Sequence, residues 1–406
     1  MNGTDTNTNP HPLLTIEKLV YGGQGLARQE GRVVLVPFVL PGEVAEVAIE
    51  SQRRGVLEAR LCGVATPAAG RAEPACPFYQ RCGGCQYQHA EYAFELEQKR
   101  QILREVLRRV GKIEAPEEIA VVSGEPWGYR NRTQFHLANG ELGYFGFGTH
   151  HLVPVDRCPI SSPRINETLG VLRDMAGERR FPRFVRSIEV FTNETDVQVN
   201  VTETGQPVSK RFFEWCAERI AGYAADAIEY AVAGDLYRVR HRSFFQVNRF
   251  LAEGLARAAL EGAEGDAALD LYAGVGLFSL PLARRFENLT AVESSGSAAG
   301  DLESNAARAG VKLAVRRQPA EVYLDELDST PDFVLADPPR AGLGKLVVRS
   351  LLRLKPPRLT VVACDPATLA RDLALLLAGG YRLEGLTLVD LFPRTFHIET
   401  IARLRA

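Results

Sequence analysis

From Ala268 to the C-terminus, short apolar runs alternate with helical stretches, and this alternation restricts the fold more than any other feature. Strands that alternate with helices form a largely parallel, doubly wound sheet. Only the short connection Phe392–Phe396 separates the last two runs, so we expect their strands to pair antiparallel at the sheet edge. The predicted strands are Ala268–Tyr272, Leu289–Glu293, Asp332–Asp337, Leu359–Cys364, Leu383–Leu391 and His397–Leu404.

The chain is too long for one ordinary core, since it has 406 residues, and we predict several domains. A polar N-terminus at 1–11 is expected to be a disordered tail. Strand-like runs separated by glycines at 12–64 suggest a small all-β barrel of the OB type. We predict a central α+β domain at 65–245 and the α/β domain at 246–406. The runs in the barrel are Leu14–Leu19, Arg32–Val36, Val44–Ile49 and Val56–Cys62.

The central region predicts one long amphipathic helix and an aromatic hairpin. Apolar residues recur at helical spacing from Ala90 to Val110. Tyr129–Phe135 and Gly143–Phe147 have the pattern of hairpin strands, and their aromatic rings suit either a protein core or stacking on unpaired bases.

The net charge does not indicate nucleic-acid binding, whereas the distribution of arginines could. The formal net charge is -2, yet arginines cluster at three places, which could be ordinary surface or could follow a phosphate backbone. The clusters are Arg100, Arg104 and Arg108; Arg179, Arg180, Arg183 and Arg186; and Arg238, Arg240 and Arg242. No run of about 18 apolar residues predicts a membrane span, and the N-terminus does not resemble a signal peptide. We therefore expect a cytoplasmic protein without a membrane partner, and a monomer.

Four of the seven cysteines could close around a metal or a cluster. Cys76, Cys82 and Cys85 lie close together in the sequence and Cys158 follows, each of Cys76 and Cys158 preceding a proline. Gly83-Gly84 lets the backbone turn tightly between two of these thiolates. Four thiolates bind either zinc or an iron–sulfur cluster, and the spacing alone does not decide between them.

A glycine turn after the first strand of the α/β domain predicts a cofactor site. In Asp270–Ser279, Gly274 and Gly276 would let the backbone approach a ligand, and Glu293 ends the next strand, where an acid suits ribose hydroxyls. A nicotinamide dinucleotide would call for a third glycine where Ser279 stands. The pattern therefore favours S-adenosylmethionine.

Further reactive side chains end the later strands. Asp337, in Asp-Pro-Pro-Arg, would lie near the methyl donor, and Gln246 in Ser-Phe-Phe-Gln-Val-Asn offers an amide. Cys364 ends a buried strand and precedes an Asp-Pro turn, with a helix expected to open at Thr368. Because open α/β sheets bind ligands at this edge, we interpret Cys364 as a nucleophile.

Together these motifs resemble the RNA 5-methyluridine (uracil-C5) methyltransferases along nearly the whole chain. The carrying segments are SFFQVN, DLYAGVG, DPPRAG, the Cys364 segment and Phe392–Glu399, in one order. Residues 17–27 and 36–43 resemble a TRAM domain, an RNA-binding barrel. The barrel and the four cysteines are similar to the iron–sulfur branch that acts on 23S ribosomal RNA.

The resemblance implies roles for single residues. Cys364 would add to C6 of the uracil and Glu399 would act as the base. Gln246, Tyr272, Gly274, Glu293 and Asp337 would hold the methyl donor or line its site, and Cys76, Cys82, Cys85 and Cys158 would bind a [4Fe–4S] cluster rather than zinc. The partner would be RNA with an unpaired or flipped uridine.

Other functions stay open at this point. They are methylation of transfer RNA, a radical enzyme that uses S-adenosylmethionine at the cluster, and an RNA-binding protein without catalysis. The chain also departs from the family, which often has Asn where Asp365 stands. A carboxylate beside the thiol would oppose thiolate formation unless it is turned away or paired.

Overall fold

The computed structural model describes residues 11–406, which form two compact units. The first unit comprises the described residues up to Ile102 together with Arg394–Phe396, and the second comprises Leu103–Pro393 and His397–Ala406. The predicted tail at 1–11 lies, apart from His11, outside the described residues. No helix within the described range is long and apolar enough to span a bilayer.

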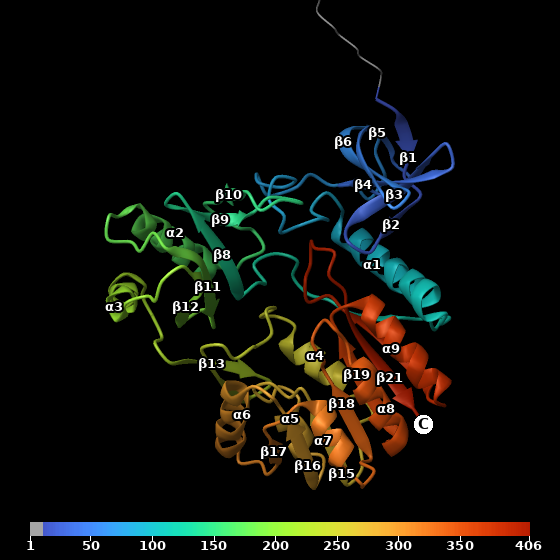
Figure 1. Ribbon diagram of the computed structural model, residues 1–406, viewed down its shortest axis with the longest axis vertical. Helices are drawn as coiled ribbons and strands as arrows, with labels where there is room; N and C mark the ends of the chain where they lie inside the picture. The colour runs from blue at the N-terminus through green and yellow to red at the C-terminus, as the bar shows by residue number, and fades with distance from the viewer. Residues whose placement is uncertain (1–10) are drawn as a thin grey trace, which may run out of the picture. The chain divides into compact units, whose positions relative to one another are not determined.

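The first unit contains one sheet of six strands in the order β1-β5-β6-β4-β3-β2. Its core is apolar, built on residues such as Ile16, Val34 and Val47, because inward-facing residues alternate along the strands. The strands are β1 (Leu13–Thr15), β2 (Lys18–Val20), β3 (Gln24–Gln29), β4 (Arg32–Pro37), β5 (Val44–Arg53) and β6 (Val56–Thr66), labelled in Figure 1.

Strand β3 is absent from the sequence prediction because Gly22, Gly23 and Gly25 suggested a turn. Gly25 lies inside β3, where a Cβ atom would come 2.4 Å from Val39 and 2.8 Å from Ile16. The glycine is therefore needed for close packing inside the sheet. The predicted run Leu14–Leu19 also proves to be two strands, β1 and β2.

A buried charge network lies in the first unit, where helix α1 (Tyr92–Val106) carries Glu95 and Lys99. Both side chains are fully buried, and Lys99 Nζ lies 2.8 Å from Glu95 Oε1. The same oxygen accepts the backbone N–H of Arg394 at 2.7 Å, and Arg394 Nη1 donates to the carbonyl of Ala90. The helix predicted at 90–110 is α-helical from Tyr92 to Val106 only. A π-helical turn, η1 (Leu107–Gly111), follows it directly.

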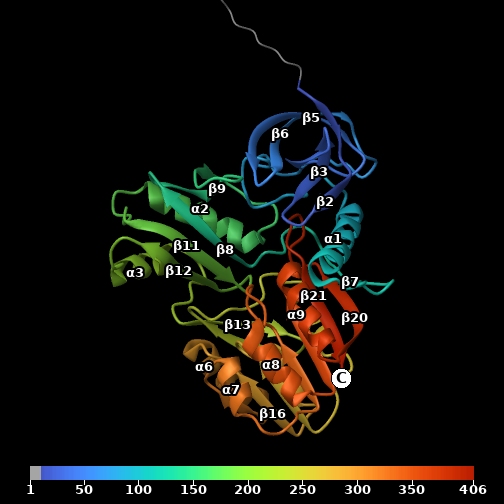
Figure 2. The ribbon, with the colours of Figure 1, turned by 45° about the vertical axis from the view of Figure 1, so that its right-hand side comes forward.

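The second unit contains a five-stranded sheet in the order β10-β9-β8-β11-β12 and a two-stranded ribbon, β13-β14. The predicted hairpin is confirmed, since β8 and β9 pair antiparallel with His136 opposite Gly143. Helix α2 packs against β9 and β11 (Figure 2). The elements are β8 (Arg132–Ala138), β9 (Glu141–Phe145), β10 (Leu152–Pro154), α2 (Pro163–Gly177), β11 (Val185–Thr192), β12 (Val197–Thr204), α3 (Lys210–Arg219), β13 (Ala227–Val232) and β14 (Asp235–Arg240).

The other sheet of the second unit has eight strands in the order β17-β16-β15-β18-β19-β21-β20-β7. The predicted doubly wound, largely parallel arrangement is confirmed, because β17, β16, β15, β18 and β19 pair in parallel and the order reverses at β15. The strands are β7 (Ala120–Val122), β15 (Ala267–Leu271), β16 (Asn288–Val292), β17 (Ala314–Arg316), β18 (Phe333–Ala336), β19 (Arg358–Ala363), β20 (Arg382–Val389) and β21 (Glu399–Arg405); the helices are α4 (Ala252–Ala259), α5 (Ser279–Ala283), α6 (Gly296–Ala309), α7 (Ala320–Glu326), α8 (Gly344–Leu354) and α9 (Pro366–Ala378).

The last two strands pair antiparallel as predicted, but their place at the sheet edge was wrong. Strand β21 inserts between β19 and β20, and β7 adds in parallel outside β20, with Val122 opposite Val389. Strands β7 and β17 have only three residues each, which is too short for a periodic signal, so neither could be predicted. In addition, β7 lies far in the sequence from the other strands of this sheet.

Replacing Glu95 by Gln should lower the free energy of unfolding by on the order of 3 kcal/mol, because Lys99 would keep a buried charge without its carboxylate. Equilibrium urea unfolding measures this change. The matched control is Glu97→Gln on the same helix, whose exposed pair with Arg100 should contribute less than about 1 kcal/mol. Equal effects of the two substitutions would contradict the stabilising role of the buried network.

Candidate active site

The carboxyl edge of the parallel strands gathers the candidate catalytic side chains. Four residues each follow the last residue of a strand, and the parallel register pairs Leu271 with Val292 and Ala336, and Ala336 with Val361. Neighbouring parallel strands therefore end together, where such sheets bind ligands. The four residues are Tyr272 after β15, Glu293 after β16, Asp337 after β18 and Cys364 after β19.

Glu399 reaches the same edge from the opposite direction. It is the first residue of β21, which runs antiparallel to β19, and Thr400 is paired with Ala363. Glu399 precedes Thr400 on β21, and Cys364 directly follows Ala363 at the end of β19. The charge of Glu399 accordingly acts on the pKa of the Cys364 thiol.

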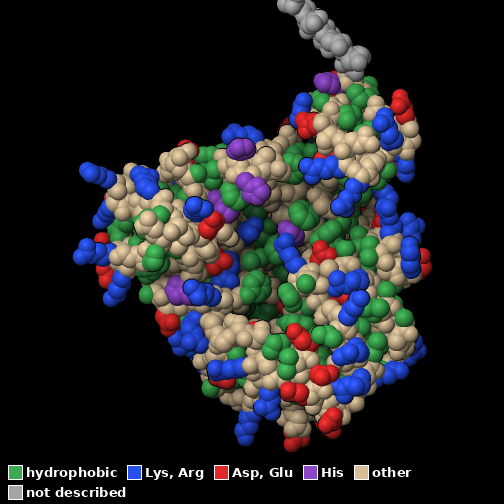
Figure 3. Space-filling model, viewed as in Figure 1, with side chains coloured by type: hydrophobic (Ala, Val, Ile, Leu, Met, Phe, Trp, Pro, Cys, Tyr) green, Lys and Arg blue, Asp and Glu red, His purple; other side chains and the backbone are tan. Residues whose placement is uncertain are grey.

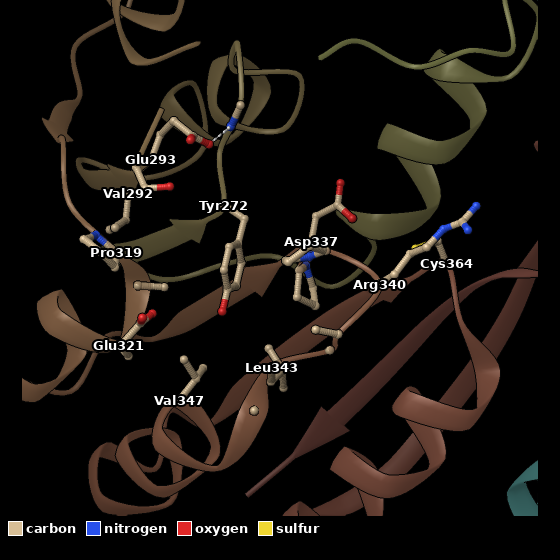
Figure 4. Close-up of a pocket in the computed structure, with 18 of the residues that line it drawn as sticks. Tyr272, Val292, Glu293, Pro319, Glu321, Asp337, Arg340, Leu343, Val347 and Cys364 are labelled. Atoms are coloured by element: carbon tan, nitrogen blue, oxygen red, sulfur yellow. Dashed lines mark hydrogen bonds between the residues drawn. The ribbon is translucent and has the colours of Figure 1, made fainter. Parts of the chain in front are cut away.

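These side chains line one cavity of about 1010 Å³ within the second unit. Figure 4 shows Tyr272 between Glu293 and Asp337, with Arg340 and Cys364 on the far side of Asp337. All seven residues that the sequence assigned to catalysis or donor binding belong to the lining: Gln246, Tyr272, Gly274, Glu293, Asp337, Cys364 and Glu399.

The glycine turn positions the carboxylate of Glu293 at the wall of this cavity. The N–H of Gly274 donates to Glu293 Oε2 at 2.9 Å, and the N–H of Ser295 donates to Oε1 at 2.6 Å. Each carboxylate oxygen keeps a further lone pair for a ligand hydroxyl. Gly276 has another purpose, since a Cβ there would lie 2.4 Å from Leu302 of α6. The residues present thus fit a ribose-bearing methyl donor.

Burial controls the acidity of the reactive groups. It raises the pKa of Cys364 to about 11, with additional effects of Glu399 and Asp337 that Arg340 opposes. It also raises the pKa of Asp337 to about 7, and that of Glu399 well above its usual range, with Asp337 contributing. Without bound ligands, the thiol is therefore protonated near neutral pH.

The sequence had Asp365 oppose the thiolate unless its carboxylate is turned away or paired, and the carboxylate is paired. Its Oδ1 accepts the backbone N–H groups of Ala367 and Thr368, both at 2.9 Å, so it caps the N-terminus of α9. The helix begins at Pro366 rather than at Thr368. The negative charges that raise the thiol pKa are instead those of Glu399 and Asp337.

Several lining residues lacked an assignment from the sequence. Arg340, Phe392 and His397 lie in motifs that the resemblance covers, so a role could have been sought for them. Phe244, which is 58% exposed, lies in the SFFQVN motif that also contains Gln246. Glu321 at the start of α7 carries no motif and could not have been found.

The four candidate cluster cysteines are divided between the units. Cys76, Cys82 and Cys85 belong to the first unit and Cys158 to the second. Gly84 N–H donates to Cys82 Sγ at 3.4 Å, as thiolate ligands commonly require. Over residues 11–406, however, no three His, Cys, Asp or Glu side chains are grouped as metal ligands. The donor chemistry fits a cluster, and the ligand set stays a prediction.

Most arginines of the three clusters are engaged by other groups. Arg100, Arg180, Arg186, Arg238 and Arg240 form salt bridges with nearby acids. Arg104 and Arg183 donate to backbone carbonyls. Figure 3 accordingly shows acidic side chains interspersed with basic ones on the visible face.

The fold is that of a class of enzymes that methylate with S-adenosylmethionine. The chain matches the crystal structure of Pyrococcus abyssi tRNA (uracil-54, C5)-methyltransferase in complex with S-adenosyl-L-homocysteine with a TM-score of 0.74. The match covers 97% of this chain and 100% of that one, at 24% sequence identity.

Sequence comparisons identify the family. Residues 221–405 match the tRNA (Uracil-5-)-methyltransferase model and residues 13–62 the TRAM domain. The 23S rRNA (uracil(1939)-C(5))-methyltransferase RlmD of Pectobacterium atrosepticum is 33% identical over 96% of this chain and 92% of the relative. An uncharacterized RNA methyltransferase of Aquifex aeolicus is 32% identical over 96% of this chain and 97% of the relative. The chain belongs to the S-adenosylmethionine-dependent RNA uracil-C5 methyltransferases.

Alkylation of Cys364 by iodoacetamide in the ligand-free enzyme should be slow near neutral pH and should rise about tenfold per pH unit below the thiol pKa of about 11. Asp337→Asn should speed alkylation at a given pH, because removal of a negative charge lowers the thiol pKa. Arg340→Gln should slow it by the opposite effect. Peptide mass spectrometry measures the rate at Cys364, and shifts of the same sign in both variants would contradict the electrostatic account.

Proposed function

We propose that this enzyme methylates C5 of one uridine in 23S ribosomal RNA, with Cys364 as nucleophile and Glu399 as base. The observation that carries the proposal is that these two side chains start from adjacent strand positions and line one cavity with the donor-binding candidates. Ribosomal RNA is favoured over transfer RNA because the RlmD relative, a 23S rRNA enzyme, is 33% identical over 96% of this chain. Such a substrate places the enzyme in the cytoplasm.

The chemistry requires a nucleophile because C5 of uracil is a weak one itself. The Cys364 thiolate adds to C6, and the electrons of the C5–C6 double bond form an enolate. C5 of this enolate then takes the methyl group. Glu399 removes the remaining C5 proton, the double bond returns, and the thiolate leaves from C6. Each step uses a residue whose side chain lines the same cavity.

The cavity has residues that would hold S-adenosylmethionine, which supplies an electrophilic methyl group when bound. Glu293, held by the N–H groups of Gly274 and Ser295, binds the ribose hydroxyls. Tyr272, Asp337 and the Gln246 amide line the rest of the site. The target uridine enters unpaired or flipped out of its helix, as enzymes acting on a base require.

The domain division at 12–64, 65–245 and 246–406 belongs to the same proposal, with the TRAM match at 13–62 supporting the first part. Cys76, Cys82, Cys85 and Cys158 bind a [4Fe–4S] cluster with a structural role. The hydrogen bond from Gly84 to Cys82 and the sequence resemblance support that ligand set.

Glu399→Gln should accumulate a covalent enzyme–RNA adduct, because addition and methyl transfer proceed while loss of the C5 proton is blocked. Incubation with unmodified 23S rRNA and labelled S-adenosylmethionine, followed by denaturing electrophoresis, detects the adduct. Cys364→Ala is the matched control and should give neither adduct nor methyl transfer. Full activity of Cys364→Ala would disprove the covalent mechanism, and no adduct with Glu399→Gln would argue against that residue as base.

Protein purified without oxygen should be brown, with iron and sulfide in equal amounts, and Cys158→Ser should lose most of both. Visible absorbance and elemental analysis measure this. Cys216→Ser is the control, since Cys216 is a buried core residue with no proposed metal. Zinc without sulfide would replace the cluster by a zinc site, and protein free of both would remove the metal proposal.

A further inference from the structure

A second cavity of about 740 Å³, here called the β11–β12 cavity, lies within the second unit. Residues of β11, β12 and α3 line it, together with the segment that follows β14. Its volume lies in the range typical of small-ligand sites. Its lining combines aromatic, amide, hydroxyl and cationic groups: Asn200, Thr202, Phe213, Tyr223, His241 and Arg242.

Arg242 differs from the two arginines that precede it at alternate positions. Arg238 pairs with Asp226 and Arg240 with Asp301, both at 2.5 Å. Arg242 is exposed and has neither a hydrogen bond nor an ion pair among residues 11–406. Its φ of 67° lies in the left-handed region, in the turn that follows β14. An exposed, unpaired guanidinium suits a phosphate group.

The acidic side chain of the cavity is already engaged, so it does not repel an anion strongly. Glu189 Oε1 accepts from the Asn200 amide at 3.1 Å and lies 3.7 Å from Arg132 Nε. The oriented Asn200 Oδ1 contacts Nδ1 of His241, and Nε2 of His241 bonds to the carbonyl of Ala225 at 2.6 Å. The imidazole ring is thereby fixed at the cavity wall.

The aromatic residues supply flat surfaces of the kind that bases stack on. Phe213 and Tyr223 are both half-buried and both line the cavity. Burial raises the pKa of Tyr223 to about 12, so its phenol is neutral and can donate a hydrogen bond. Rings beside amide and hydroxyl groups are typical of sites for unpaired bases.

The β11–β12 cavity and the active site share one short segment. His241 and Arg242 line the first, whereas Phe244 and Gln246 line the second. Arg242 and Phe244 are two residues apart, so their backbones are separated by at most about 7 Å. The two cavities are thus lined from neighbouring positions of one short segment.

We infer that the β11–β12 cavity binds a second, unpaired nucleotide of the substrate RNA, close in sequence to the target uridine. Its base lies among Phe213, Tyr223 and His241, and its phosphate pairs with Arg242. The inference rests on the proposed function for its substrate class, and it adds a recognition site outside the catalytic cavity.

Arg242→Ala and Ala225→Trp test the inference by different means. The first removes the unpaired cation, and the second fills the cavity from an exposed lining position. Arg257→Ala is the matched control, because Arg257 on α4 is exposed, has no partner among the described residues and lines neither cavity. Steady-state methylation of unmodified 23S rRNA should show KM for RNA raised about tenfold in both test variants, with the effect in KM rather than kcat.

A binding measurement separates this inference from the proposed function. Fluorescence anisotropy with labelled oligouridylate should show weaker binding by Arg242→Ala, with the slope of log K against log salt reduced by about 0.7. Wild-type enzyme that methylates no RNA would overturn the proposed function, and the binding measurement would still decide on the cavity. Unchanged RNA affinity in both test variants, or an equal loss in Arg257→Ala, would overturn the inference.

Discussion

The pairing register between β19 and β21 is the constraint on which the active site depends. It sets Thr400 opposite Ala363 and so brings Glu399 to the end of the strand that carries Cys364. The side-chain period of a strand is two, so a shift of β21 by one residue would turn Glu399 to the opposite face. The parallel strands meanwhile fix Tyr272, Glu293 and Asp337 at the same edge. One antiparallel strand thus adds a carboxylate to a site that parallel strands otherwise build.

Burial at this edge raises the pKa of the candidate nucleophile and of the candidate base alike. It raises the pKa of Asp337 to about 7 and that of Glu399 well above its usual range, and it keeps the thiol protonated near neutral pH. A protonated Cys364 is a poor nucleophile toward adventitious electrophiles. Arg340 is the lining cation that favours its thiolate. The thiol is therefore unreactive in the ligand-free site. Formation of the thiolate requires cationic or hydrogen-bonding groups from the substrates, which lower the thiol pKa.

The sequence predicted the chemistry of the sheet edge better than its surroundings, for physical reasons. Buried strands are continuous apolar runs, so the polar residue that ends each run, such as Asp337 or Cys364, can be recognised without a structure. The position of β21 depends on long-range pairing, which local patterns do not encode. Asp365 was a missed local signal, since an acid followed by proline is typical of a helix N-terminus. The β11–β12 cavity joins residues of β11, β12 and α3 with the α3–β13 connection and the segment after β14, and no motif links them.

The internal pairing of the arginines changes the kind of RNA recognition to expect. Long-range attraction depends on uncompensated charge, and the formal net charge is only -2. Five of the clustered arginines are already balanced by acids, whereas Arg108, Arg179 and Arg242 have no partner among residues 11–406. These three are the arginines of the clusters that can neutralise a phosphate without breaking an existing contact. Under the proposed function, unpaired bases stacked in cavities then supply the discrimination, which favours a loop over a regular helix as the substrate.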